Sequence, residues 1–291
     1  MKIYRNAIIM AAGTSSRFVP LSAECPKGLI EVKGEVLIER QIRQLHEAGI
    51  TDITIVVGYK AEMFEYLKGK FGVDIVLNED YAHFNNTSSI IRVVDKLNNT
   101  YICSSDNYFP LNVFEYVPKE SYYSALYANG VTTEYCITTD DDDQIVDVTV
   151  GGNDKWYMVG HVYFNNEFSS AFRKVILEEY ANHETKLCYW EDIYIKYLDT
   201  LPKMKIKRYD DNAIKEFDSI DELRKFDESY IMDTRSSIVK EICKQLGEEE
   251  SNVYGFKNIK HNGNYLLFSF NVGGGDTYIY SAENGAKIEK Q

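Results

Sequence analysis

Short continuous apolar runs alternate with stretches of helical spacing over the first third of the chain. Strands are expected at Ala7–Met10, at Ile53–Gly58, at Val73–Leu77 and in the run that ends at Asp106. Helices are expected between them, at Val36–Ala48, Glu62–Lys70 and Ser88–Leu97. Regular alternation of apolar strands and helices predicts an α/β fold, with a doubly wound, mostly parallel, Rossmann-like sheet covered on both faces.

The pattern changes after about Tyr122. Short alternating segments with turn signals predict strands and hairpins, and helical spacing returns at 167–182 and 191–198. Ser219 with Glu222 forms a capping box for one more helix, and we place the end of this first domain at residue 229. Residues 230–291 are expected to form a small α+β appendage, in which a helix over 234–246 precedes two strands around the turn GGGD.

Charge and cysteine content exclude several classes of protein. A net charge of -13 argues against surfaces for nucleic acid or anionic membrane, whereas a local cluster of Lys and Arg, helped by a divalent cation, still permits an anionic small substrate. Five scattered cysteines predict reduced thiols. The apolar run near the N-terminus is too short for a signal peptide or a membrane span, so a cytoplasmic protein without membrane insertion is expected.

The segment AAGTSSRFVPLSAECPKGL follows the first expected strand. A glycine after a strand lets the backbone approach a bound group, and the amides that follow form a cradle for phosphates. Arg17 and Lys27 add positive charge, and Pro20 and Pro26 stiffen the loop that carries them. The dinucleotide fingerprint and the Walker loop are both absent, which disfavours a Rossmann oxidoreductase. The expected nucleotide-binding residues of this loop are Ala11, Ala12, Gly13, Thr14, Ser15, Ser16 and Arg17.

The order of these residues resembles the signature of the sugar-phosphate nucleotidyltransferase superfamily. The residues Gly13, Arg17, Pro20, Pro26 and Lys27 match it, whereas Ser15 replaces its second glycine and Ser22 replaces its threonine. The segments YAHFNNTSSI, SSDNYF, YWEDIYIKYL and AIKEFDSIDELRKF are similar to the bacterial CTP:phosphocholine cytidylyltransferases. That resemblance covers about three quarters of the chain.

Nucleotidyl transfer needs Mg²⁺ because negative oxygens shield the α-phosphorus, and one or two protein carboxylates suffice to hold the ion. Asp106 ends a strand and is the expected ligand, although a strand-end aspartate alone is more often a turn cap. The second carboxylate is expected from Glu191 or Asp192, with an exposed acidic helix start as the alternative. The run Asp140–Asp143 is better explained as a solvated hairpin loop.

The resemblance implies further substrate contacts. Aromatic faces hold the quaternary ammonium of choline, and Tyr135, Tyr189 and Trp190 lie in the matching stretches, where core packing is an equal alternative. Asn85, Asn86 and Ser88 lie where the family meets the nucleotide base and ribose, with helix capping as the alternative for Asn86 and Ser88.

The implied reaction converts CTP and phosphocholine to CDP-choline and pyrophosphate by in-line attack, with Lys27, Arg17 and Asp106 as the catalytic residues. The alternatives are another acceptor, either 2-aminoethylphosphonate or a sugar 1-phosphate, and a non-catalytic nucleotide-binding regulator. The tail is similar to the opening hairpin of choline-kinase-like phosphotransferases. A homo-oligomer and a longer bifunctional chain with a choline kinase are both left open.

Overall fold

The computed structural model describes residues 4–114, 117–263 and 265–291, which divide into two compact units. The first unit comprises residues 1–13 and 37–215, apart from the positions outside the described ranges. The second comprises Thr14–Val36 together with Glu216–Gln291. The signature segment, Thr14–Val36, therefore folds with the C-terminal part of the chain, whereas Ala11–Gly13 belong to the first unit. The predicted boundary at residue 229 stays a prediction.

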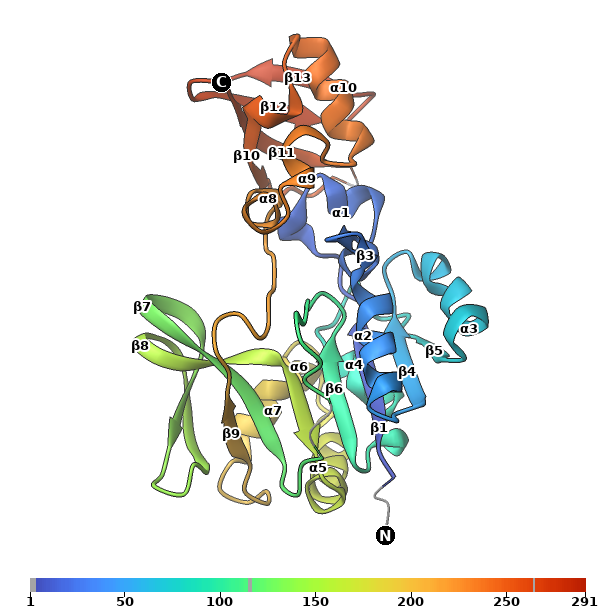
Figure 1. Ribbon diagram of the computed structural model, residues 1–291, viewed down its shortest axis with the longest axis vertical. Helices are drawn as coiled ribbons and strands as arrows, with labels where there is room; N and C mark the ends of the chain where they lie inside the picture. The colour runs from blue at the N-terminus through green and yellow to red at the C-terminus, as the bar shows by residue number, and fades with distance from the viewer. Residues whose placement is uncertain (1–3, 115–116, 264) are drawn as a thin grey trace. The chain divides into compact units, whose positions relative to one another are not determined.

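A seven-stranded sheet in the order β5-β4-β1-β6-β8-β7-β9 forms the centre of the first unit. Its first four strands are parallel, and β8 is antiparallel to both of its neighbours. This mostly parallel sheet with flanking helices confirms the predicted fold class (Figure 1). The strands are β1 (Asn6–Ala11), β4 (Asp52–Val57), β5 (Asp74–Leu77), β6 (Thr100–Ser104), β7 (Tyr122–Thr139), β8 (Ile145–Phe164) and β9 (Lys205–Arg208).

The helices of this unit follow the predicted alternation closely. They are α2 (Leu37–Glu47), α3 (Tyr66–Phe71), α4 (Thr87–Arg92), α5 (Asn166–Glu179), α6 (His183–Lys186) and α7 (Trp190–Lys196). The expected helix over 88–97 ends as α4 at Arg92 and continues as the 3-10 turn η4 (Val94–Lys96). Helix α3 likewise begins later than predicted, because η3 (Ala61–Phe64) replaces the first turn of the helix expected from Glu62.

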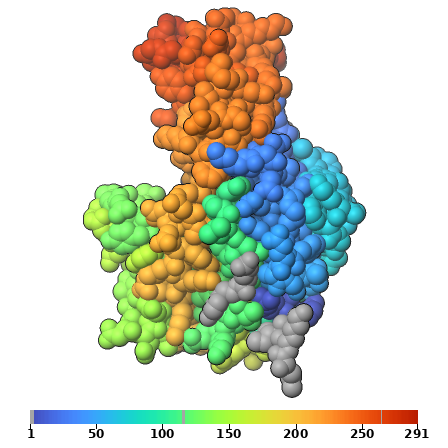
Figure 2. All heavy atoms as spheres, in the orientation of Figure 1, coloured from blue at the N-terminus to red at the C-terminus, as the bar shows by residue number. Residues whose placement is uncertain are grey.

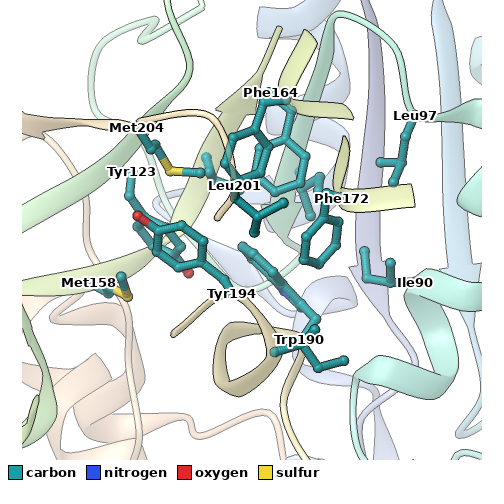
Figure 3. Close-up of a cluster of buried hydrophobic side chains, with 14 of the residues drawn as sticks. Ile90, Leu97, Tyr123, Met158, Phe164, Phe172, Trp190, Tyr194, Leu201 and Met204 are labelled. Atoms are coloured by element: carbon teal, nitrogen blue, oxygen red, sulfur yellow. The ribbon is translucent and has the colours of Figure 1, made fainter. Parts of the chain in front are cut away.

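Aromatic and aliphatic side chains pack α5 and α7 against one face of the sheet. Trp190 of α7 stacks on Tyr123 of β7 at 5.8 Å between ring centroids, and Phe164 and Phe172 meet the indole edge-on (Figure 3). Burying one such ring stabilises the fold by about 1.5–3 kcal/mol. This packing fixes the start of α7 against the sheet.

The second unit contains the signature segment and a small C-terminal sheet. The signature segment has three short helical turns, η1 (Ser16–Phe18), α1 (Leu21–Glu24) and η2 (Lys27–Leu29), and the strand pair β2 (Glu31–Val32) and β3 (Glu35–Val36). The C-terminal helices are α8 (Ile220–Phe226), α9 (Ser229–Met232) and α10 (Ser237–Leu246), and η5 (Glu250–Asn252) follows them. The antiparallel sheet consists of β10 (Val253–Asn258), β11 (Leu267–Val272), β12 (Asp276–Ser281) and β13 (Lys287–Lys290).

This sheet is larger than the hairpin that the sequence predicts. The hairpin β11–β12 is present, and β10 and β13 extend it on either side. Phe268 and Phe270 of β11 are fully buried, as is Ile242 of α10, so the unit has an apolar core of its own. In the space-filling view the C-terminal atoms, orange to red, pack as one continuous mass (Figure 2). Among the described residues, every helix is too short or too polar to cross a bilayer.

Candidate functional site

The loop after β1 begins at the carboxyl edge of the parallel sheet. Ala11 and Ala12 are buried, and Ala12 O accepts a 3.1 Å hydrogen bond from Tyr59 N, which follows β4. Gly13 is exposed, and a Cβ built on it would meet nothing within 4 Å. The open space above Gly13 suits the close approach of a bound group to the backbone.

The loop continues in the second unit through a left-handed residue. Ser15 has φ 50° and ψ 42°, and its carbonyl accepts a 2.9 Å hydrogen bond from Phe18 N. This is the position where the superfamily signature has its second glycine, and left-handed backbone is the conformation that glycine adopts without strain. Thr14, Ser16 and Arg17 are exposed.

Two carboxylates of the second unit hold the two cations of the signature segment. Asp218 Oδ2 accepts a 2.7 Å hydrogen bond from Arg17 Nη1, and Lys27 Nζ lies 3.7 Å from both Asp218 Oδ1 and Glu216 Oε1. The Lys27 side chain is only 7% exposed, whereas that of Arg17 is 74% exposed. Glu216 and Asp218 lie in the segment AIKEFDSIDELRKF, where no pattern in the sequence predicts that they hold Arg17 and Lys27.

Asp106 lies two residues beyond β6 and is half-buried. Ser105 N donates a 3.0 Å hydrogen bond to Met10 O, which ties the end of β6 to β1. The carboxyl ends of β1 and β6 therefore meet at one edge, as parallel topology requires. This edge carries both Asp106 and the residues from Ala11 to Gly13.

The carboxylates at the start of α7 each accept hydrogen bonds from protein donors. Glu191 accepts 3.1 Å hydrogen bonds at Oε1 from the Tyr123 hydroxyl and at Oε2 from Asn86 Nδ2. Burial raises the pKa of Glu191 to about 7, in spite of these hydrogen bonds. Asp192 accepts a 2.7 Å hydrogen bond from the Tyr135 hydroxyl and a 2.8 Å hydrogen bond from the Tyr189 amide. The second of these bonds caps the helix.

The three predicted choline contacts differ in their surroundings. Trp190 is 3% exposed and lies in the hydrophobic core, so its ring packs against protein on the faces described above. Tyr189 is 46% exposed, and its ring meets that of Tyr135 edge-on at 6.4 Å. Burial and the bond to Asp192 raise the pKa of the Tyr135 hydroxyl. The structure thus brings two phenol rings and one carboxylate together at the start of α7.

The predicted base-binding residues link α4 to neighbouring segments. Asn86 Oδ1 accepts a 2.8 Å hydrogen bond from Trp190 N, in addition to the bond from its amide to Glu191. Ser88 is fully buried, and its hydroxyl donates to Asn85 O at 2.7 Å. Asn85 N donates to Lys186 O at 2.9 Å. The two bonds of Asn86 support the start of α7. The nucleotide contacts predicted for Asn85, Asn86 and Ser88 stay predictions.

The two predicted sources of metal ligands differ in their hydrogen-bond partners. The ion binds ionised carboxylates and keeps several waters. Asp106 is a half-buried carboxylate at a strand end and fits such a ligand. The oxygens of Glu191 and Asp192 each accept one hydrogen bond from a phenol or amide donor, which leaves lone pairs for a metal ion, and their role as metal ligands stays a prediction. In the described part of the chain, no three His, Cys, Asp or Glu side chains are grouped as metal ligands.

Comparison with known proteins identifies relatives for most of the chain. Residues 7–116 match the family of MobA-like NTP transferase domains. The choline-phosphate cytidylyltransferase of Streptococcus pneumoniae is 35% identical over 226 residues, which are 77% of this chain and 97% of that relative. The 2-aminoethylphosphonate cytidylyltransferase of Lancefieldella rimae is 35% identical over 235 residues, which are 79% of this chain and 95% of that relative.

A solved structure agrees with these matches. The CTP:phosphocholine cytidylyltransferase from Streptococcus pneumoniae superimposes with a TM-score of 0.75 at 34% identity. The match covers 78% of this chain and 99% of that structure. About a fifth of this chain therefore lies outside the superposition.

Proposed function

Because the chain belongs to the cytidylyltransferases of the nucleotidyltransferase superfamily, we propose that it converts CTP and phosphocholine to CDP-choline and pyrophosphate. A phosphate oxygen of phosphocholine forms a bond to the α-phosphorus of CTP. The bond from that phosphorus to the oxygen bridging the β-phosphate breaks, and pyrophosphate leaves. The observation that carries the proposal is the signature segment, with Lys27 and Arg17 held side by side on Asp218.

The cations of the signature segment suit a polyphosphate. Arg17 is largely exposed, so its guanidinium can exchange Asp218 for phosphate oxygens at low cost. Lys27 is buried, and an ammonium with little water around it interacts more strongly with a charge that develops in the transition state. In this proposal Arg17 binds the β- and γ-phosphates, and Lys27 stabilises the reacting centre. The amides of residues 11–17 complete the phosphate cradle.

Mg²⁺ is part of the proposal, with Asp106 as its protein carboxylate. Bound there, the ion would offset negative charge on the triphosphate oxygens. Glu191 or Asp192 stays the predicted source of a second carboxylate, since the hydrogen bonds from Tyr123, Asn86 and Tyr135 leave lone pairs on their oxygens.

The group at the start of α7 supports a choline-type acceptor. A quaternary ammonium has no N–H to donate and is held by aromatic faces beside a carboxylate. Tyr189 is the exposed ring of this group, and Asp192 is the carboxylate next to it. The competing acceptor, 2-aminoethylphosphonate, has a primary ammonium with three N–H donors, and the Asp192 carboxylate could accept hydrogen bonds from them.

Pyrophosphate release tests the proposal directly. The full chain is assayed with CTP, UTP or GTP, with and without Mg²⁺, against phosphocholine, 2-aminoethylphosphonate and sugar 1-phosphates. We expect release with CTP and phosphocholine only in the presence of Mg²⁺. Higher kcat/KM with 2-aminoethylphosphonate than with phosphocholine would overturn the acceptor, and release without a divalent cation would overturn the metal requirement.

A further inference from the structure

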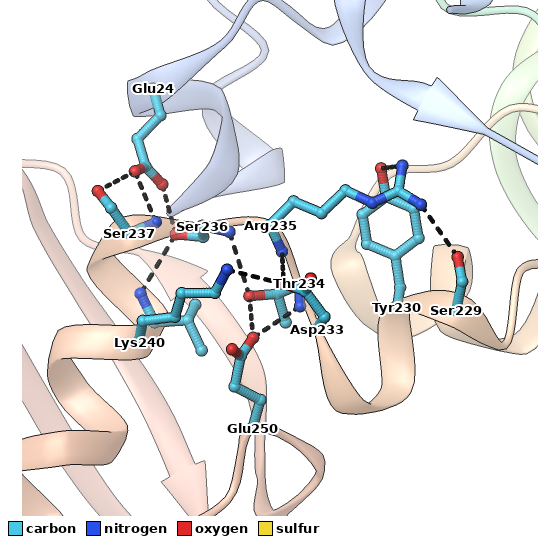
Figure 4. Close-up of polar contacts among 11 residues, drawn as sticks. Glu24, Ser229, Tyr230, Asp233, Thr234, Arg235, Ser236, Ser237, Lys240 and Glu250 are labelled. Carbon is cyan, nitrogen blue, oxygen red and sulfur yellow. Dashed lines mark hydrogen bonds and ion pairs between the residues drawn. The ribbon is translucent and has the colours of Figure 1, made fainter. Parts of the chain in front are cut away.

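Glu24, in the middle of the signature segment, joins this segment to residues 236–237 of the C-terminal part of the chain. The Glu24 carboxylate, at the end of α1, points at the first turn of α10 (Figure 4). Its Oε1 accepts a 2.8 Å hydrogen bond from Ser237 N, and its two oxygens also accept from the hydroxyls of Ser236 and Ser237. A carboxylate at the start of a helix is additionally stabilised by the helix dipole. Glu24 lies three residues before Lys27.

A second junction lies on the other side of Lys27, at β2. The buried hydroxyl of Tyr230 donates a 2.5 Å hydrogen bond to Glu31 O. The Arg235 guanidinium lies over the Tyr230 ring at 4.4 Å from its centroid (Figure 4). Its Nη1 lies 3.2 Å from Glu31 O and 3.4 Å from Glu31 Oε1. Lys27 is thus flanked along the chain by two contacts with residues 230–237.

The donors of both junctions are themselves fixed to the C-terminal fold. Glu250 Oε2 accepts from the amide and the hydroxyl of Thr234, a fully buried residue between Tyr230 and Ser236. Arg224 of α8 donates to the carbonyls of Glu250 and Val253, at 2.7 Å each. The contacts therefore run without a break from Glu24 and Glu31 through residues 230–237 to η5 and β10.

The signature segment needs such support. Its turns η1, α1 and η2 have only three or four residues each, far below the length at which a helix is stable alone. We propose that Glu24 is a positioning residue of the nucleotide site, and that residues 230–250 act through it to fix Arg17 and Lys27. This proposal rests on the proposed function. It makes the C-terminal segment a working part of the transferase site.

Full-chain variants test the proposal. Glu24→Ala removes the junction, Glu24→Gln keeps an oxygen for Ser237 N, and Ser237→Ala removes one hydroxyl. Glu289→Ala, in the exposed strand β13, is the matched control. The measurements are kcat/KM for CTP, thermal stability, and hydrogen exchange of the amides in 14–33 and in β1 and β4.

We expect Glu24→Ala to lower kcat/KM for CTP about tenfold, which is roughly 1.4 kcal/mol, and Glu24→Gln to lower it less. Amides in 14–33 should exchange faster, while those in β1 and β4 keep their protection and Glu289→Ala resembles wild type. An unchanged kcat/KM in folded Glu24→Ala protein overturns the proposal, even if its melting temperature falls. If that variant does not fold, Ser237→Ala decides by the same criterion. If the wild-type protein shows no turnover, the proposed function is rejected instead. In that case, unchanged amide exchange of residues 14–33 in Glu24→Ala rejects the positioning role separately.

Discussion

Lys27 Nζ lies 3.7 Å from Oδ1 of Asp218, in a unit that joins the signature segment to the C-terminal part of the chain. The ammonium is almost fully buried, whereas the carboxylate is 39% exposed. A buried cation is costly unless charges of opposite sign surround it, and Glu216 supplies a second one. The two carboxylates therefore offset the cost of burying the Lys27 ammonium and hold the side chain in place.

Lys27→Ala tests the catalytic role. We expect kcat/KM for CTP to fall by about 100-fold or more, as for loss of a group that stabilises charge in a transition state. Lys174→Ala, which removes an exposed cation from α5, is the control and should leave turnover unchanged. Folded Lys27→Ala protein with more than about a third of wild-type activity would remove Lys27 from the mechanism.

Tyr189 is the position that should distinguish acceptors. A cation–π contact contributes about 0.5–2 kcal/mol, so Tyr189→Ala should raise KM for phosphocholine roughly 2- to 30-fold. Tyr189→Phe keeps the aromatic face and should stay near wild type. Tyr4→Ala removes another exposed tyrosine and serves as the control. Equal KM values for the Ala and Phe variants would argue against an aromatic contact with choline.

The buried carboxyl of Glu191 should make stability depend on pH. Its pKa of about 7 in the folded chain lies above the ordinary 4.5, so the folded chain binds more protons between these values. The stabilisation by this group is therefore full below pH 4.5 and is lost as the pH rises through 7. Glu191→Gln stays neutral, so its unfolding free energy relative to wild type should increase between about pH 5 and pH 8.

Urea denaturation at a series of pH values provides this measurement. Glu178 is an exposed glutamate of α5, and Glu178→Gln serves as the control, which should show no such trend. A difference between Glu191→Gln and wild type that stays constant with pH would contradict the prediction.

The left-handed backbone of Ser15 gives a prediction for stability. Ser15→Gly should leave the unfolding free energy unchanged or raise it by up to about 1 kcal/mol, because glycine adopts this backbone without strain. Ser16→Gly, at the next residue in η1, should instead lower it by about 0.5–1 kcal/mol. Urea midpoints of the two variants compare them directly, and equal losses would mean that Ser15 is not strained.

Much of the first unit could be predicted because its strands are continuous apolar runs. The order of strands and helices up to β6 follows from that pattern, and the carboxyl-edge rule placed Ala11 and Asp106 together. The capping role of Ser219 is also confirmed, since its hydroxyl accepts a 3.2 Å hydrogen bond from Glu222 N. Glu222 itself accepts from Asp218 N at 2.8 Å.

Other features depend on contacts that sequence patterns do not encode. Strand β13 has four residues, three of them charged, and a register shift between Tyr254 and Lys257 interrupts β10, so alternation gives neither strand a clear signal. Trp190 has the aromatic face that a choline site needs, but its ring packs in the core, where it contacts Tyr123 and Phe172. The partners of Lys27 and Glu24 lie about 200 residues away along the chain. Only the folded arrangement reveals such pairs.

The interleaving of Thr14–Val36 with Glu216–Gln291 also bears on synthesis of the protein. On the ribosome the signature residues emerge well before the partners that hold them, because about 200 residues separate the two along the chain. The nascent chain can assemble the seven-stranded sheet while Lys27 still lacks Asp218. Competence for catalysis is therefore acquired only after Glu216 and Asp218 have been translated, and a chain released before them would lack the carboxylates that hold Arg17 and Lys27.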